Sequence, residues 1–109
     1  MTIRTTTHKC RQYVQTQTSF IAANIYAKPH PIHDLYVVYS YGEHFPLFIY
    51  DHNSDTWLEN SDGYSRTTSQ HRSKAHPHCD TVKINTEQME QVLNTGTIAG
   101  IVTPMNNAA

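Results

Sequence analysis

The chain has 109 residues, a typical length for one domain, and we expect a single domain over residues 1–109. Eight Lys and Arg residues stand against nine Asp and Glu residues, so the net charge is −1 with histidine neutral. This balance argues against a strongly basic protein that coats nucleic acid. Charged residues make up 16% of the chain, below the roughly 25% of an average protein, so we expect a polar rather than an ionic surface.

The cysteines and the apolar segments indicate the cellular compartment. Cys10 and Cys79 are too few for a disulfide framework. Residues 1–7 lack the apolar stretch of a signal peptide, and the longest apolar runs are far shorter than the roughly 20 residues that cross a bilayer. We therefore predict a cytoplasmic protein with reduced thiols and no membrane contact.

The N-terminal part of the chain has little regular pattern. Residues 1–17 are polar and rich in Thr and Gln, and we expect them to form either a flexible arm or a first strand. Residues 19–27 are apolar, and Pro29 and Pro31 follow them, which favours a strand over a helix. The segment around the two prolines is expected to be a stiff, extended connection.

The centre of the chain predicts a β-meander. Residues 35–41 are β-branched and aromatic on both alternating faces, which indicates a central strand. Residues 45–50 and 57–60 predict the next two strands, and the turns between them are dense in polar residues. Because such short connections cannot form parallel crossovers, we expect antiparallel pairing. The predicted turns are residues 41–44, 51–55 and 60–63.

A change of pattern follows the meander. Residues 64–68 fit either a fourth strand or a loop. Ser69 is expected to cap a short helix over residues 70–75. Val82 and Ile84 then alternate as in a strand, so one further strand is expected after this helix.

The C-terminal part predicts the main helix, over residues 86–95. An apolar stripe at helical spacing supports it, and Gly96 suits the position just after its end. Residues 98–102 are expected to pack back as a last strand, and residues 104–109 to fray. The expected fold class is therefore α+β: a small antiparallel sheet of four or five strands in a meander, with one main C-terminal helix packed on one face.

Two strings of polar and aromatic residues stand out in the middle of the chain. They are Ser-Tyr-Gly-x-His-Phe-Pro-Leu at residues 40–47 and Tyr-Ser-x-Thr-Thr-Ser-x-His at residues 64–71. Together with Trp57 between them, they resemble a family of small uncharacterised proteins from bacteriophages and plasmids, over about residues 35–75. The resemblance implies a mobile-element origin and an accessory role, and it brings no assigned chemistry.

Acidic and basic residues occupy separate segments of the sequence, and the acidic segment favours a role in binding another protein. Residues 43–62 contain five acids and no Lys or Arg. Because aromatic residues anchor many protein interfaces, an acidic and aromatic surface is expected here, and it would bind a basic surface on a host protein. The protein would then be a non-enzymatic accessory protein that modulates or inhibits its partner. The predicted partner-binding residues are Asp51, Asp55, Trp57, Glu59 and Asp62.

The alternative is weak binding of nucleic acid. Residues 1–28 and residues 64–79 contain basic side chains and no acid. If the two segments lie together they make a basic face, and if not, basic and acidic segments neutralise each other in the fold. Short hydroxyl side chains beside Arg and His suit contact with phosphates. The predicted nucleic-acid-binding residues are Arg66, Thr67, Thr68, His71, Arg72 and Lys74.

A second alternative is a metal-dependent enzyme. Zinc favours His and Cys ligands, and residues 76–80 contain several such side chains. Their spacing matches neither of the usual zinc motifs, and the chain has no nucleophile elbow. We therefore expect no enzymatic activity and no cofactor, and a homodimer stays open. The candidate metal ligands are His76, His78 and Cys79.

Aromatic residues are concentrated in the predicted sheet. Most are expected to lie in the core or in cross-strand pairs. Any that are exposed on an open face would bind a protein or stack on single-stranded bases. The residues are Tyr36, Tyr39, Tyr41, Phe45, Phe48, Tyr50, Trp57 and Tyr64.

Overall fold

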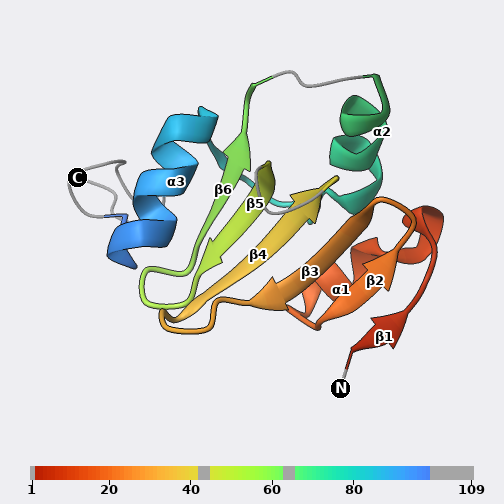
Figure 1. The fold of residues 1–109 in the computed structure, drawn as a ribbon, viewed down its shortest axis with the longest axis horizontal. Coiled ribbons are helices and arrows are strands. Elements are labelled where there is room, and N and C mark those ends of the chain that lie inside the picture. The colour runs from red at the N-terminus through yellow and green to blue at the C-terminus, as the bar shows by residue number, and fades with distance from the viewer. Residues whose placement is uncertain (1, 42–44, 63–65, 99–109) are drawn as a thin grey trace.

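Five consecutive strands form the middle of the fold, with helices before and after them, in the residues that the computed structural model describes, which are 2–41, 45–62 and 66–98 (Figure 1). For residues 66–68 the description covers the backbone alone. The helical segments are the 3-10 helix η1 (Thr7–Lys9) and the α-helices α1 (Arg11–Gln15), α2 (Arg66–Ala75) and α3 (Thr86–Thr95). The strands are β1 (Ile3–Arg4), β2 (Phe20–Ala22), β3 (Ile25–Pro29), β4 (Leu35–Ser40), β5 (Pro46–Asp51), β6 (Thr56–Asn60) and β7 (Val82–Ile84). The fold is a small α+β fold, as the sequence predicts.

The seven strands of the described residues form one mixed sheet, in the order in which they occur in the sequence. The predicted meander is present from β2 to β6, where each strand pairs antiparallel with the next. Both edge strands pair parallel instead, β1 with β2 and β7 with β6. The prediction of four or five antiparallel strands is therefore wrong in number and in direction at the edges. Helical connections explain the difference, because η1 with α1 and then α2 return the chain to the same end of the sheet.

The apolar run that predicts one strand over residues 19–27 forms a hairpin instead. β2 ends at Ala22 and β3 begins at Ile25, so Ala23 and Asn24 make a two-residue turn. Asn24 has a φ of 58°, in the left-handed region that asparagine tolerates better than most residues. The sequence conceals this turn because neither Gly nor Pro interrupts the apolar run.

Helices cover both faces of the sheet, and alternation along β4 shows which residues meet them. Tyr36 and Val38 point to the face that carries α1 and α2, in a core that includes Val14 and Ala75. Val37 points to the opposite face, which carries α3. Every residue of β4 is buried, as predicted for the central strand. The expectation of a helix on one face alone is therefore incomplete.

The predicted C-terminal helix is confirmed as α3. Asn85 caps it, and Asn85 and Gln88 bond each other's backbone N–H groups at 2.8 and 3.0 Å in a capping box. Gly96 ends the helix with a φ of 76°. A side chain on Gly96 would also collide with the imidazole of His33. Both the left-handed backbone and the lack of space therefore favour glycine at this position.

Two segments differ from the sequence-based expectation. α2 begins at Arg66, so most of the segment 64–68 is the first turn of a helix and neither a strand nor a loop. The N-terminal residues 3–15 contain β1, η1 and α1. Cys10 and Val14 of this segment are fully buried, and these two side chains fix it against the sheet.

Some predictions fall on residues outside the described ranges. These are the turn at 42–44, most of the last strand at 98–102, and the tail at 104–109. Ile98, the last described residue, is buried in the core between α3 and the sheet. None of the helices in the described part of the chain is long and apolar enough to cross a membrane.

Candidate functional site

The N-terminal segment packs against α2, and this contact joins two basic parts of the sequence. η1 and α1 both contact α2. The guanidinium of Arg11 donates from Nε to the carbonyl of His76 at 2.8 Å and from Nη2 to that of Ser73 at 2.5 Å. The side-chain amide of Gln15 donates to the carbonyl of Pro77 at 3.1 Å. The basic N-terminal segment therefore lies beside the basic segment that contains α2.

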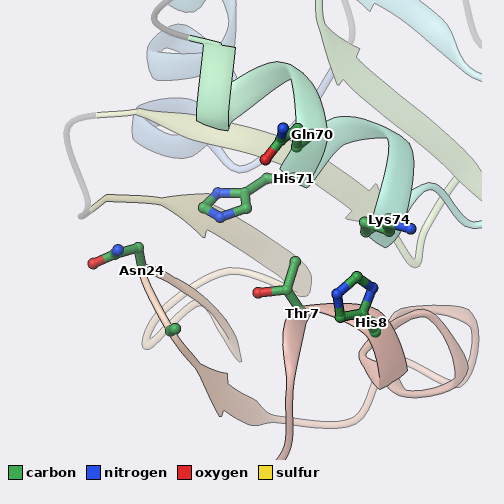
Figure 2. A pocket seen from close by; sticks show the side chains of 7 residues that line it. Thr7, His8, Asn24, Gln70, His71 and Lys74 are labelled. Atoms are coloured by element: carbon green, nitrogen blue, oxygen red, sulfur yellow. The ribbon is translucent and has the colours of Figure 1, made fainter.

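A pocket of about 450 Å³ lies between η1, α2 and the β2–β3 turn (Figure 2). Its polar side chains are hydroxyl, amide, imidazole and ammonium groups, all of which can donate a hydrogen bond. No carboxylate of the described residues lines it. The lining residues, which we call the basic pocket, are Thr7, His8, Ala23, Asn24, Gln70, His71 and Lys74.

His71 forms the buried wall of the basic pocket. It is 3% exposed, and its Nδ1 lies 2.8 Å from the hydroxyl oxygen of Ser40. Burial lowers the pKa of His71, so its ring is neutral at neutral pH. When Nδ1 accepts the hydroxyl proton of Ser40, the neutral ring has its own proton on Nε2 and can donate it. Ser40 itself is fully buried, so this pair does not offer a nucleophile to a substrate.

His8 and Lys74 supply the exposed cationic end of the basic pocket. His8 comes from η1 and Lys74 from α2, and Asn24 lies at the opposite end of the pocket (Figure 2). Both residues are exposed to solvent. The ammonium group of Lys74 and an imidazole N–H of His8 can therefore both donate to an anion that occupies this end of the pocket.

Of the residues predicted to bind nucleic acid, His71 and Lys74 line the basic pocket. Arg72 lies elsewhere: its Nη2 donates to the backbone carbonyl of Asp62 at 2.7 Å, and its Nε lies 3.9 Å from a carboxylate oxygen of Glu59. Arg72 is thus bonded to protein groups and does not line the basic pocket. The first turn of α2 contains the other three predicted residues, and the structure describes only the backbone there. These residues are Arg66, Thr67 and Thr68.

Sequence reasoning misses four polar residues of the basic pocket. Thr7 and His8 belong to the basic N-terminal segment, which was predicted only as a whole. Asn24 is a single polar residue inside an apolar run, and without Gly or Pro beside it the run does not indicate a turn. Gln70 lies within the predicted short helix, and only the contact with η1 distinguishes it from any surface glutamine.

The five residues predicted as an acidic partner-binding surface do not form one. Asp51, Trp57 and Glu59 are buried, with 2%, 7% and 5% exposure. Asp51 accepts the N–H of Asn53 at 3.1 Å and the hydroxyl of Ser54 at 2.8 Å, which closes the β5–β6 turn. The prediction of a surface position is wrong for Asp51 and Glu59, because acids without a nearby base in the sequence find partners elsewhere in the fold. Trp57, although only 7% exposed, lines a cavity together with Asp55.

Glu59 is the clearest case of such a buried acid. Its Oε1 accepts the hydroxyl of Thr81 at 2.7 Å and lies 3.2 Å from Nε2 of His76. Its Oε2 lies 3.9 Å from Nε of Arg72. The carboxylate therefore joins β6 to the end of α2 and to the segment that precedes β7, and it belongs to the interior of the fold.

Asp62 binds the start of α3 from outside the helix. Its Oδ2 accepts the backbone N–H of Thr86 at 2.8 Å, where a helix presents unpaired donors. This hydrogen bond is the main reason that the pKa of Asp62 is lowered. Of the five predicted residues, Asp55 alone is classed as exposed, while Asp62 is half-buried.

Asp55 lines a second cavity of about 450 Å³ beside the β5–β6 turn. Its carboxylate accepts the hydroxyl proton of Tyr50, and this bond raises the pKa of Tyr50 to about 12. The ring of Trp57 lies 5.1 Å from that of Tyr50, so aromatic surface lies next to the carboxylate. The residues of this acidic pocket are Gln17, Tyr50, Asp55, Thr56, Trp57, Cys79 and Asp80.

The candidate metal ligands do not converge on one point. Among the described residues, no three His, Cys, Asp or Glu side chains are grouped as a metal site. His76 instead contacts Glu59, and its Nδ1 accepts the backbone N–H of His78 at 3.0 Å. Burial and two neighbouring carboxylates raise the pKa of the Cys79 thiol, which disfavours the thiolate that a metal requires.

No family model, no curated protein and no solved structure gives a significant match to this chain. The resemblance to phage and plasmid proteins therefore stays a prediction. The function has to be inferred from the chemistry of the two pockets.

Proposed function

We propose that the protein is a small non-enzymatic binding protein that holds the phosphates of a nucleic acid in the basic pocket. One observation supports this above all: His8, His71 and Lys74 converge on a pocket whose polar groups can all donate. Lysine, hydroxyl and amide side chains are the groups that proteins use against nucleic-acid backbones. The geometry thus favours the alternative that the sequence ranked second.

The proposal implies weak binding that depends on salt. The net charge is −1, so long-range attraction to a polyanion is small. Arg11 and Arg72 lie near α2 but are bonded to protein groups. Lys74 is the permanent cation of the basic pocket, so a plot of log affinity for a single strand against log salt concentration should have a slope of about −0.7.

An accessory role in a mobile element, with a cytoplasmic location, is part of the same proposal. The resemblance implies this role. Occupation of a strand or of a strand end is sufficient to modulate a host process that uses the same nucleic acid. No catalytic step is needed for such an effect.

The double variant His8→Ala, Lys74→Ala tests the proposal. It should weaken retention of single-stranded DNA about tenfold in an electrophoretic mobility shift at low salt, because charge-assisted contacts are lost. Lys83→Ala is the matched control, since Lys83 is exposed on β7 and does not line the basic pocket. The proposal is wrong if the native protein retains no strand at low salt, or if Lys83→Ala loses as much as the double variant.

A second candidate is binding of a basic protein through the acidic pocket. Asp55 and Asp80 lie there beside the rings of Tyr50 and Trp57. A Lys or Arg side chain of a host protein suits such a site, because it pairs with a carboxylate and stacks on an aromatic ring. This candidate reduces the predicted surface to Asp55 and Trp57, and a lysine-rich peptide is the ligand that it predicts.

A further inference from the structure

A third cavity adjoins the basic pocket at the β2–β3 turn, and its lining is largely apolar and aromatic. It measures about 400 Å³. Within it, Ile21 is 48% exposed and Tyr41 is 37% exposed, so two large apolar side chains face solvent together. The residues that line this aromatic groove are Ile21, Ala22, Asn24, Ile25, Tyr26 and Tyr41.

The basic pocket and the aromatic groove share one wall. Asn24 lines both cavities. The carbonyl of Asn24 accepts the backbone N–H of Tyr41 at 2.9 Å. The ring centroid of Tyr41 lies 5.6 Å from that of His71, which is the buried wall of the basic pocket. A ligand that fills both cavities therefore passes directly over Asn24 and Tyr41.

Both residues of the shared wall have a left-handed backbone. The φ angles are 58° at Asn24 and 67° at Tyr41. This conformation is uncommon for tyrosine, and residues held in such regions concentrate at ligand sites. The hydrogen bond between the two residues fixes the turn against the end of β4. The backbone of Asn24 and Tyr41 is thus held in one defined conformation.

We propose that the basic pocket and the aromatic groove form one site for the end nucleotide of a single strand with a terminal phosphate. This inference rests on the proposed function and adds which part of the nucleic acid is bound. The terminal phosphate occupies the basic pocket, and its base lies against Tyr41 in the aromatic groove. Because any base can stack on an aromatic ring, no strong sequence preference is expected.

The donors of the basic pocket favour a terminal phosphate over an internal one. An internal phosphodiester has a single negative charge and two unesterified oxygens. A terminal phosphate has three such oxygens and a charge of about −1.5 to −2 at neutral pH. Imidazole, ammonium, amide and hydroxyl donors line the pocket from η1, the β2–β3 turn and α2, and the third oxygen and extra charge of a terminal phosphate strengthen its hydrogen bonds to them.

Fluorescence anisotropy with short oligothymidylate strands tests this site. Three strands are compared, with a 5′-phosphate, a 3′-phosphate, or hydroxyls at both ends. One phosphorylated strand should bind about tenfold more tightly than the strand with two hydroxyls. Equal affinities for all three strands would overturn this inference and leave the proposed function standing. Absence of binding by every strand contradicts both.

Variants of Tyr41 test the groove. Tyr41→Leu keeps apolar volume but removes the ring, so it should weaken binding of the preferred phosphorylated strand about tenfold, and Tyr41→Phe should lose less. If Tyr41→Leu folds and binds as tightly as the native protein, the base does not occupy the groove, which would then suit an apolar protein segment. If Tyr41→Leu does not fold, Ile21→Glu at the exposed rim replaces it, with the same expected loss.

Competition separates the two halves of the site. The thymidine monophosphate whose phosphate is at the preferred end, 5′ or 3′, should displace the preferred phosphorylated strand at a concentration about tenfold lower than inorganic phosphate does, because the nucleotide also fills the groove. Equal potency of the two competitors would show that the base contributes nothing, and it would overturn the assignment of the aromatic groove.

Discussion

His71 reaches the basic pocket from the buried side of α2, and the hydroxyl of Ser40 holds its ring at 2.8 Å. Burial of the ring disfavours its charged form and lowers its pKa. No carboxylate of the described residues lines the pocket, so none there offsets this cost of burial. Protonation of His71 therefore works against the folded state.

Stability should fall as pH falls from about 7.5 to 5.5, in part through His71. The folded-state pKa of His71 lies below its unfolded value of 6.5, so the unfolded chain binds the proton first. The stability that the neutral ring provides is complete above this range and declines as pH falls through it. Urea unfolding at several pH values should show a smaller slope for His71→Gln than for the native protein, by at most about 1.4 kcal/mol per pH unit.

The control for this experiment is His78→Gln, since His78 is exposed and outside the basic pocket. It should leave the slope close to that of the native protein. If His71→Gln and His78→Gln change the slope equally, the burial of His71 does not govern the pH dependence, and its neutral state in the pocket is not supported.

The buried carboxylate of Glu59 connects β6, α2 and the segment before β7. Glu59 of β6 contacts His76 just after α2 and Thr81 just before β7, and it lies near Arg72 within α2. These contacts connect the last two strands through the crossover helix. The same helix presents Lys74 and His71 to the basic pocket, so Glu59 indirectly fixes the position of the site.

Glu59→Gln should destabilise the protein by about 2 kcal/mol, because it removes the charge that pairs with Arg72 and weakens the hydrogen bonds with Thr81 and His76 inside the fold. Thermal unfolding measures this as a fall in Tm of roughly 8–16 °C for a domain of this size. Glu90→Gln, at an exposed position on α3, makes the same chemical change and should shift Tm far less. An equal shift for both variants would contradict the role assigned to Glu59.

Elements with a strong apolar pattern could be predicted from the sequence, and those fixed by tertiary contacts could not. β4 is apolar on both faces and α3 has a cap, a stripe and a final glycine, so both were found at nearly their observed bounds. β1 has two residues, and it forms through its pairing with β2. The β2–β3 turn lacks Gly and Pro, so local pattern did not reveal it.

The candidate site was predictable only in part, for reasons that concern the whole molecule. Segregation of charge along the chain indicates two basic segments, and in the structure these segments, the N-terminal one and the one that contains α2, lie in contact. The sequence could not show which charges become buried partners, and Glu59 and Arg72 are such a pair. Nor could it show that η1 lies beside α2, which creates the basic pocket. A net charge of −1 therefore does not indicate that Lys74 lines one pocket while Asp55 and Asp80 line another.

Backbone amide NMR spectra of the native protein, titrated with single-stranded DNA at low salt, test the central claim most directly. We predict that the largest shifts occur at residues 7–8, at Asn24 and at residues 70–74, around the basic pocket. A parallel titration with a lysine-rich peptide tests the acidic pocket, and absence of shifts at Asp55 and Asp80 would remove that second candidate. DNA that leaves the basic-pocket resonances unchanged would contradict the account.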